Sequence, residues 1–162
     1  MQDLVKKLSD LLKAKNIKLV TAESCTGGLL AASITHRAGA SAVFDRGYVT
    51  YTNASKHEEL GVAEVLLDTF GAVSAEVAEA MAKGALKNSH AGLAVSITGI
   101  AGPDGGSAKK PVGLVYFGYA LKGGSSGSME ERFAGGSRET IQARASKTAL
   151  LHLIKVLEEG KV

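Results

Sequence analysis

Hydrophobic and polar residues follow helical and strand periods in turn along the chain. Residues 2–15 are predicted to form an amphipathic helix, because apolar side chains recur there at helical spacing: Leu4, Val5, Leu8, Leu11 and Leu12. Asn16 is a suitable residue to end that helix. The next segment, residues 18–22, is β-prone and leads directly into Gly27 and Gly28, so the pattern there is strand, tight turn and helix.

The rest of the chain continues to alternate strands with helices. Runs rich in β-branched, aromatic or other apolar residues predict four further strands, over residues 43–52, 93–98, 112–121 and about 128–134. Helices are predicted from Leu29 to near Gly39, from a cap at Asn53 to Gly61, from a cap at Ser74 to about Lys87, and onward from a cap at Ser137. The glycine- and serine-rich stretch 123–128 is short enough to be the tip of a hairpin.

Helices that separate strands favour a layered α/β architecture, while the late hairpin makes part of the sheet antiparallel. We therefore expect a three-layer α/β/α sandwich around a mixed sheet of five or six strands. The chain has 162 residues and neither an internal repeat nor a linker, so residues 1–162 are expected to form a single domain.

Composition narrows the classes of partner. A net charge of +3 without a basic cluster argues against nucleic acid, and no apolar run is long enough to predict a membrane span. The single cysteine, Cys25, cannot form an intrachain disulfide, which favours the cytoplasm. Apolar faces can pair in a homodimer, although no coiled-coil pattern indicates one.

The first candidate for chemistry is the segment 21–28, where a strand stops and a helix begins. Backbone amides at such a junction can hold an anion or a developing oxyanion. Ser24 is a candidate nucleophile there, but serine is also a preferred helix cap. Cys25 offers a thiol, yet a lone cysteine is commonly an inert buried residue, and the sequence identifies no histidine partner for it.

The second candidate is the segment 51–56, which places the Tyr51 phenol at a strand end and the Lys56 amine about one turn into the next helix. A lysine base must lose its proton, and lowering its pKa from about 10.4 to about 7.5 takes about 4 kcal/mol. Burial can supply that free energy. The alternative interpretation is a solvated surface lysine beside a tyrosine that only packs.

The third candidate is the glycine-rich segment 98–107, at the carboxyl end of a strand, where ligands of open α/β sheets bind. Its spacing matches neither the phosphate-loop nor the dinucleotide fingerprint, so an ordinary turn remains an alternative. Thr98 and Asp104 are its candidate polar contacts. Arg138 and Arg144, in the last predicted helix, can receive a phosphate, but their six-residue spacing does not align them on one stripe.

Metal chemistry is not indicated. The order His57, Glu58, Glu59 lacks the second histidine of a zinc-protease motif, and the four histidines are scattered. We expect neither a metal nor a cofactor.

Four separated blocks carry a resemblance to a known family: TAESCTGGLLAASIT, GYVTYTNASKHEELGV, FGAVSAEVAEAMAKGAL and SITGIAGPDGGSAKKPVGLVYFGYA. In this order, and over nearly the whole chain, they resemble the carboxy-terminal domain family of the competence-induced protein CinA. With no further domain ahead of residue 1, the sequence is similar to the stand-alone members, which are nicotinamide-nucleotide amidases.

The resemblance implies hydrolysis of nicotinamide mononucleotide to nicotinic acid mononucleotide and ammonia, in pyridine nucleotide salvage, by a serine–lysine mechanism. It makes Ser24 the nucleophile and Lys56 its base, with the Tyr51 and Thr98 hydroxyls orienting the pair or relaying protons. Substrate contacts are then expected from the glycine-rich turns and the last helix: Thr26, Gly27, Gly28, Gly99, Gly102, Asp104, Gly105 and Arg138. GlyGlySerArg replaces the commoner GlyAspArg before the helix, and Gln142 stands where the family often has another arginine.

Two other functions remain open at this point. A non-catalytic nucleotide-binding module would keep Lys56 protonated as a counter-charge and would bind its ligand without releasing ammonia. A thiol amidase would use Cys25 and would be inactivated by alkylation.

Overall fold

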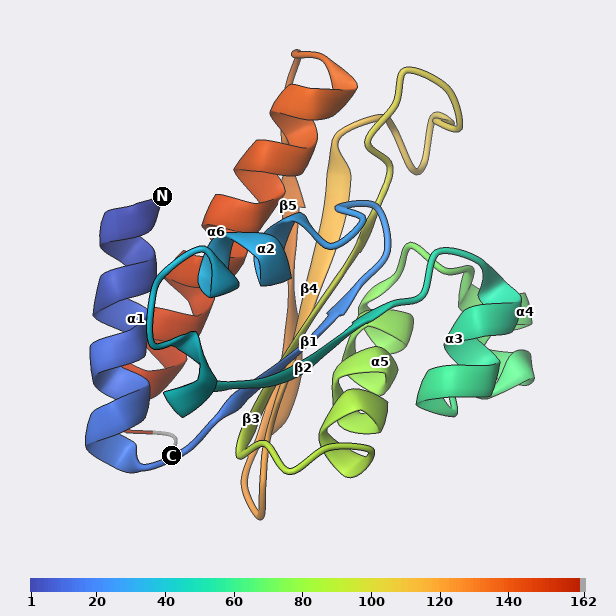
Figure 1. Ribbon diagram of the computed structural model, residues 1–162. Helices are drawn as coiled ribbons and strands as arrows, with labels where there is room; N and C mark the ends of the chain where they lie inside the picture. The colour runs from blue at the N-terminus through green and yellow to red at the C-terminus, as the bar shows by residue number, and fades with distance from the viewer. Residues whose placement is uncertain (161–162) are drawn as a thin grey trace.

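A five-stranded mixed sheet separates two layers of helices in the computed structural model, which describes residues 1–160 (Figure 1). The strands lie in the order β2-β1-β3-β4-β5, and their bounds are β1 Leu19–Glu23, β2 Phe44–Val49, β3 Leu93–Gly99, β4 Leu114–Leu121 and β5 Ser126–Arg132. Strands β1, β2 and β3 run parallel, whereas β4 is antiparallel to both β3 and β5. The predicted mixed three-layer architecture is confirmed, with five strands among the described residues.

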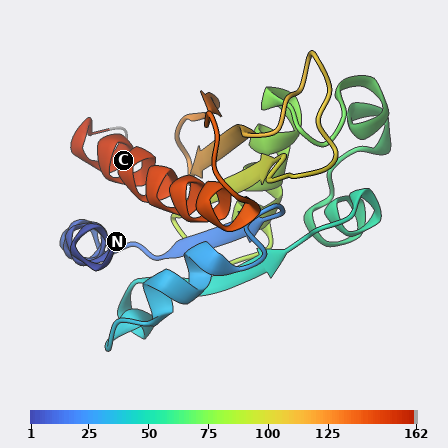
Figure 2. The ribbon, with the colours of Figure 1, turned by 90° about the horizontal axis from the view of Figure 1, so that it is seen from above.

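The helices divide between the two faces of the sheet, as the view from above shows (Figure 2). One face carries α1 Gln2–Lys15, α2 Leu29–Thr35 and α6 Arg138–Glu158; the other carries α3 Asn53–Leu60, α4 Glu64–Phe70 and α5 Ala75–Lys87. A short 3-10 turn, Ala40–Ala42, precedes β2. The sequence analysis did not predict this turn or α4.

Several predicted ends of helices are confirmed. Asn16 adopts the left-handed conformation after α1, with φ of 53°, and the Ser74 and Ser137 hydroxyls accept from backbone amides in the first turns of α5 and α6. The predicted cap at Asn53 is wrong. Thr52 caps α3 instead, in a reciprocal pair of hydrogen bonds with Ser55 that satisfies both backbone amides.

Further boundaries differ from the predictions: α2 ends at Thr35 rather than near Gly39, and β5 covers Ser126–Arg132 rather than about 128–134. Strand β2 ends at Val49 rather than at residue 52, because residues 50–52 leave the sheet to start α3. The first residue of β4 is Leu114 rather than residue 112, since Gly113 turns the chain with φ of 95°. As a result, the Thr50 and Tyr51 carbonyl groups face the Lys56 side chain of α3, while the Thr50 amide still donates to the Glu23 carbonyl of β1.

Two hydrophobic clusters fill the layers. The larger lies between the sheet and α1, α2 and α6, and it includes Leu8, Leu12, Leu93, Leu150 and Leu153. The smaller lies under α3, α4 and α5 and is rich in small residues, among them Ala22, Ala82, Ala85 and Ala94. Small side chains allow α5 to lie close against the sheet.

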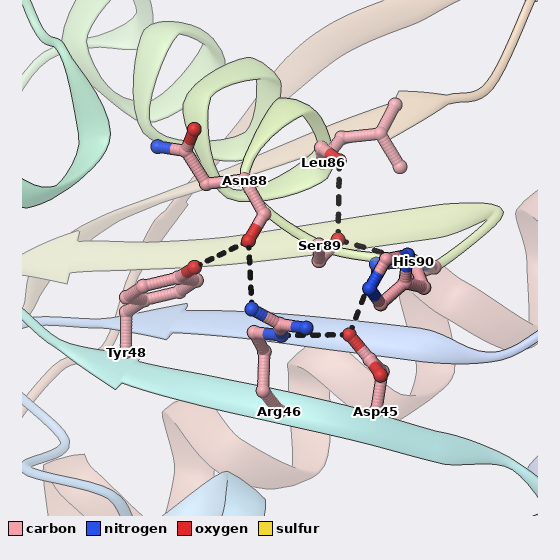
Figure 3. Close-up of polar contacts among 8 residues, drawn as sticks. Asp45, Arg46, Tyr48, Leu86, Asn88, Ser89 and His90 are labelled. Carbon is pink, nitrogen blue, oxygen red and sulfur yellow. Dashed lines mark hydrogen bonds and ion pairs between the residues drawn. The ribbon is translucent and has the colours of Figure 1, made fainter.

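Strand β2 forms one edge of the sheet and is fastened to the end of α5 by polar contacts (Figure 3). The Asn88 carbonyl accepts from the Tyr48 hydroxyl at 2.7 Å and from the Arg46 guanidinium at 3.1 Å. The Asp45 carboxylate accepts from Arg46 and from the His90 backbone amide. These contacts hold the strand from which Thr50 and Tyr51 emerge.

Gly118 on β4 marks the closest approach of helix to sheet and gives a test of this packing. A Cβ at this position would lie 2.1 Å from the Ala78 carbonyl oxygen of α5. Gly118→Ala should therefore lower the free energy of unfolding by ~1–3 kcal/mol, measured by urea denaturation. Gly127→Ala on neighbouring β5 is the control, because its Cβ would meet only the Tyr119 ring, at 3.0 Å. Equal stability of the two variants would contradict the packing described.

Candidate active site

Ser24 follows directly on β1, at the carboxyl edge of the three parallel strands. Its amide donates to the Ile97 carbonyl of β3 at 2.9 Å, so the residue is fixed to the sheet although it lies outside the strand. Gly27 and Gly28 then turn the chain with φ of 61° and 102°. The alternative role of Ser24 as a helix cap is wrong, because Gly28 occupies the N-cap position of α2 and the Ser24 hydroxyl bonds elsewhere.

Lys56 is the fourth residue of α3, and its side chain is 1% exposed, which excludes the interpretation as a solvated surface lysine. Its Nζ lies 2.9 Å from the Ser24 Oγ. The same nitrogen lies 2.8 Å from the Thr50 carbonyl oxygen and 3.2 Å from the Tyr51 carbonyl oxygen. The structure thus brings the amine and the hydroxyl together across 32 residues of sequence.

All three partners of Lys56 are oxygen atoms: Nζ donates to the Ser24 hydroxyl and to the Thr50 and Tyr51 carbonyl groups, and the Ser24 hydroxyl donates to the Tyr51 carbonyl at 3.4 Å. A neutral amine has two N–H donors and one lone pair, and the two carbonyl oxygens can only accept. In the neutral form, with the two N–H groups donated to Thr50 and Tyr51, the lone pair can receive the Ser24 hydroxyl proton. Among the described residues, no carboxylate forms an ion pair with Lys56. Burial lowers the pKa of Lys56 from its ordinary value of 10.5 to about 8.

The Tyr51 and Thr98 hydroxyls lie beside this pair without bonding to it. Thr98 Oγ1 donates to the Ala72 carbonyl at 2.9 Å. The Tyr51 side chain is 56% exposed, and its hydroxyl accepts from the Arg138 guanidinium. What Tyr51 supplies to Lys56 is its backbone carbonyl. The predicted role of these two hydroxyls in orienting the pair or relaying protons therefore remains a prediction.

A cavity of about 250 Å³ opens over Ser24 and Lys56. Most of the residues predicted from sequence for the site line it: Ser24, Tyr51, Lys56, Thr98, Gly99, Gly102, Asp104, Gly105 and Arg138. Sequence reasoning missed its apolar wall, formed by Ala72, Val73, Ile100 and Ala101. Ala72 and Val73 fall within the third block of the family resemblance, but small apolar residues carry no chemical signal that could have singled them out.

Of the predicted turn residues, Thr26, Gly27 and Gly28 are not among those that line the cavity. The Gly27 amide donates to the Ser24 carbonyl at 3.1 Å and so is not free to hold an oxyanion. Cys25 does line the cavity, and it follows the candidate nucleophile directly. Cys25 therefore replaces Gly27 as the candidate source of an oxyanion donor.

Helix α6 places two side chains over the site. Arg138, its first residue, donates to the Gly102 carbonyl at 2.8 Å as well as to Tyr51. Gln142, one turn later, donates to the Cys25 carbonyl at 2.9 Å, so it supports the turn that carries the nucleophile. Arg144 instead contacts the Ala134 and Gly135 carbonyls, which agrees with the expectation that it does not share a stripe with Arg138.

The Cys25 thiol is poorly suited to nucleophilic chemistry. The residue is 5% exposed, and burial raises the pKa of the thiol to about 12. Within residues 1–160 there is no group of three or more His, Cys, Asp or Glu side chains that could hold a metal ion. No helix in this range is long and apolar enough to cross a membrane.

The chain matches known proteins along nearly its whole length. The sequence model of the CinA C-terminal domain matches residues 1–157. The chain is 50% identical to the nicotinamide-nucleotide amidohydrolase PncC of Enterobacter agglomerans, over 96% of each chain. It is 47% identical to the protein of that name from Escherichia coli strain K12, over 93% of this chain and 90% of that one.

Solved structures agree as well. The crystal structure of the competence/damage inducible protein CihA from Agrobacterium tumefaciens superposes with a TM-score of 0.92 and 47% identity, over 96% of this chain and 94% of that one. Other relatives are longer: the chain is 51% identical to the CinA-like protein of Mycolicibacterium vanbaalenii but spans 34% of its length. With its sequence matched almost from end to end and its fold shared, this chain belongs to the CinA C-terminal domain family.

Proposed function

We propose that this chain is a nicotinamide-nucleotide amidase, which converts nicotinamide mononucleotide and water into nicotinic acid mononucleotide and ammonia in pyridine nucleotide salvage. The observation that carries the proposal is the 2.9 Å contact between the Lys56 amine and the Ser24 hydroxyl inside a cavity. The names of the relatives from Enterobacter agglomerans and Escherichia coli support the choice of substrate.

In the proposed reaction, the lone pair of Lys56 takes the Ser24 proton while Ser24 Oγ attacks the carboxamide carbon. The tetrahedral intermediate collapses when its C–N bond breaks and Lys56 returns the proton to the leaving nitrogen, which departs as ammonia. A water molecule then attacks the remaining ester, again giving a proton to Lys56, and Ser24 leaves with a proton restored. The Cys25 amide is the proposed donor to the oxyanion, an interaction worth about 3 kcal/mol in acyl-transfer sites.

Arg138 is the proposed partner of the substrate phosphate. A guanidinium has five N–H donors, and Arg138 uses two of its groups on Tyr51 and Gly102. Among the described residues no carboxylate pairs with it. The glycines at 99, 102 and 105 line the same cavity, so backbone there can approach the nucleotide closely.

We also propose a cytoplasmic enzyme that acts on a small-molecule nucleotide, supported by the free and buried state of its one cysteine. A homodimer, and the absence of nucleic-acid and membrane partners, remain predictions. A non-catalytic nucleotide-binding module would keep Lys56 as a cation and would bind the nucleotide without releasing ammonia. The contact of the Lys56 amine with the Ser24 hydroxyl favours the amidase over this alternative.

Ser24→Ala should reduce ammonia release from nicotinamide mononucleotide by at least about 10³-fold, because the nucleophile is lost. The melting temperature should stay close to that of the wild type, since the hydroxyl bonds only within the site. The assay uses chelator-treated protein, and the matched control is Ser33→Ala on α2, whose hydroxyl donates to the Leu29 carbonyl away from the cavity. Substantial ammonia release by Ser24→Ala, or activity that depends on added metal, would refute the proposed chemistry.

The pH profile tests Lys56 as the base. Only the neutral amine can accept the Ser24 proton, and with a pKa of about 8 roughly one molecule in ten carries it at pH 7. We expect kcat/KM to rise with pH up to about 8 and to level off above it, and Lys56→Met to abolish activity throughout. Lys83→Met, on the exposed face of α5, should keep the wild-type profile. A flat profile between pH 6 and 9 would exclude Lys56 as the titrating base.

The same pKa has a consequence for stability. The native protein holds the pKa of Lys56 near 8, below the unfolded value near 10.5, so between these values the unfolded chain binds more protons. Native stability should therefore gain up to about 3 kcal/mol from this residue as the pH rises through the window. The measurement is the free energy of unfolding in urea of wild type and Lys56→Met at pH 7.5 and at pH 10, compared between the two proteins. A stability difference that does not change with pH would contradict the burial of a titrating amine.

Cys25→Ala should retain activity of the same order as the wild type, because the thiol takes no part in the proposed reaction. Iodoacetamide at pH 8 should likewise leave the native enzyme active, since burial keeps the thiol protonated and covered. Both are measured by ammonia release, with mass spectrometry to follow alkylation. Rapid loss of activity in step with alkylation, together with an inactive Cys25→Ala variant, would favour the thiol amidase instead.

A further inference from the structure

Glu23 is a buried carboxylate next to the nucleophile, and the proposed reaction does not use it. It is the last residue of β1 and is 1% exposed. Its Oε1 accepts from the Thr26 hydroxyl at 2.6 Å and from the Leu30 amide at 2.9 Å. Its Oε2 accepts from the Ala31 amide at 3.0 Å. The sequence analysis did not single out this residue.

Burial of a carboxylate is costly unless hydrogen bonds and nearby positive charge compensate for the lost water. No ion pair formed by described residues involves Glu23. Its compensation consists of the three donors and the positive end of α2, whose first-turn amides would otherwise lack acceptors. An ordinary cap lies directly before its helix, whereas Glu23 reaches back across the intervening turn 24–28.

The backbone of Glu23 joins Ser24 to Thr50, one of the residues whose carbonyl accepts from Lys56. Its neighbour Ser24 is held to β3, and the Glu23 carbonyl accepts from the Thr50 amide at 2.9 Å. Thr50 in turn offers its own carbonyl to the Lys56 amine. Glu23 thus lies where the turn 24–28, which carries the nucleophile, meets residues 50–56, which carry the base. Its side chain bonds across the same turn.

We infer that Glu23 is a positioning residue for the amidase reaction: its carboxylate fixes the turn 24–28 so that the Ser24 hydroxyl stays within proton-transfer reach of Lys56. This inference rests on the proposed function for the identity of the substrate. The positioning itself concerns only the Ser24 hydroxyl and does not depend on which substrate binds. Glutamine cannot replace this carboxylate. Whichever way its amide group is turned, the NH2 would meet the backbone amide of Leu30 or of Ala31, and both of these can only donate.

Glu23→Gln should lower kcat about 10- to 100-fold and leave KM within about threefold, because a shift of about 1 Å in a reacting group costs about that much in rate. The midpoint of the pH profile should stay near 8, since burial rather than Glu23 sets the pKa of Lys56. Thr26→Val, which removes one donor to the carboxylate, should show a smaller loss of the same kind, and Thr26→Ser should restore the rate.

A second measurement makes the test independent of the substrate. A sulfonyl fluoride labels an activated serine when the serine oxygen bonds to sulfur, fluoride leaves, and the hydroxyl proton passes to the base. The labelling rate of Ser24, followed by mass spectrometry per folded molecule, should fall in Glu23→Gln in parallel with kcat. A wild-type protein that labels at Ser24 but releases no ammonia would refute the proposed substrate, while the effect of Glu23→Gln on labelling would still decide the role of Glu23.

Ser96→Ala is the control for a purely structural effect. The Ser96 hydroxyl is fully buried in β3, donates to the Ala78 carbonyl and accepts from the Gly118 amide, all outside the cavity. It should lower the melting temperature without changing kcat or the labelling rate of folded protein. The inference is overturned if folded Glu23→Gln keeps the wild-type kcat and labelling rate, or if only its KM changes. Should Glu23→Gln not fold, unchanged kcat and labelling in Thr26→Val would overturn it instead.

Discussion

An amine without a counter-ion is the feature on which this site depends. Lys56 is enclosed so fully that its proton becomes easy to remove, and its neighbours are two carbonyl oxygens and one hydroxyl rather than a carboxylate. A carboxylate in the same place would raise the pKa of the amine and remove its ability to act as a base at neutral pH. The two carbonyl groups accept hydrogen bonds from Lys56 but stabilise its positive charge less than a carboxylate would. The third hydrogen-bonding position of Nζ faces the Ser24 hydroxyl.

The parallel part of the sheet explains why residues distant in sequence meet at this point. Ser24 follows β1, Thr50 and Tyr51 follow β2, and Thr98 lies near the end of β3. Adjacent strands are about 4.8 Å apart, so neighbouring carboxyl ends place their following residues within side-chain reach of one another. The antiparallel strands β4 and β5 extend the sheet, while α6 returns over this edge and adds Arg138 and Gln142.

The sequence predicted most elements and the pairing of Ser24 with Lys56, but for different reasons. Amphipathic and β-rich runs are local signals, so α1, α5 and the five strands could be predicted from periodicity. The pairing came from family resemblance, since spacing alone left Lys56 open to a surface position. Burial of a lysine depends on tertiary packing over α3, which no local pattern reports. Glu23 and Gln142 could not be predicted for the same reason, because their partners lie on other elements. The cap at Thr52 was missed for a local reason: the next residue, Asn53, is an equally suitable cap.

The distribution of charge around the turn 24–28 also determines where a substrate anion can bind. A strand-to-helix turn rich in glycine suggests a phosphate site at the helix start, and the sequence allowed that interpretation. Here the Glu23 carboxylate already accepts from the Leu30 and Ala31 amides. A phosphate placed there would meet a buried negative charge and amides that are already bonded, so the start of α2 is unsuitable for it. The guanidinium of Arg138, which lines the same cavity, is then the cation that an anionic group of the proposed substrate would reach, with its neutral carboxamide at Ser24. In the proposed complex, Arg138 rather than Lys56 would then balance the charge of the phosphate, because an anion paired with Lys56 would raise the pKa of the lysine base.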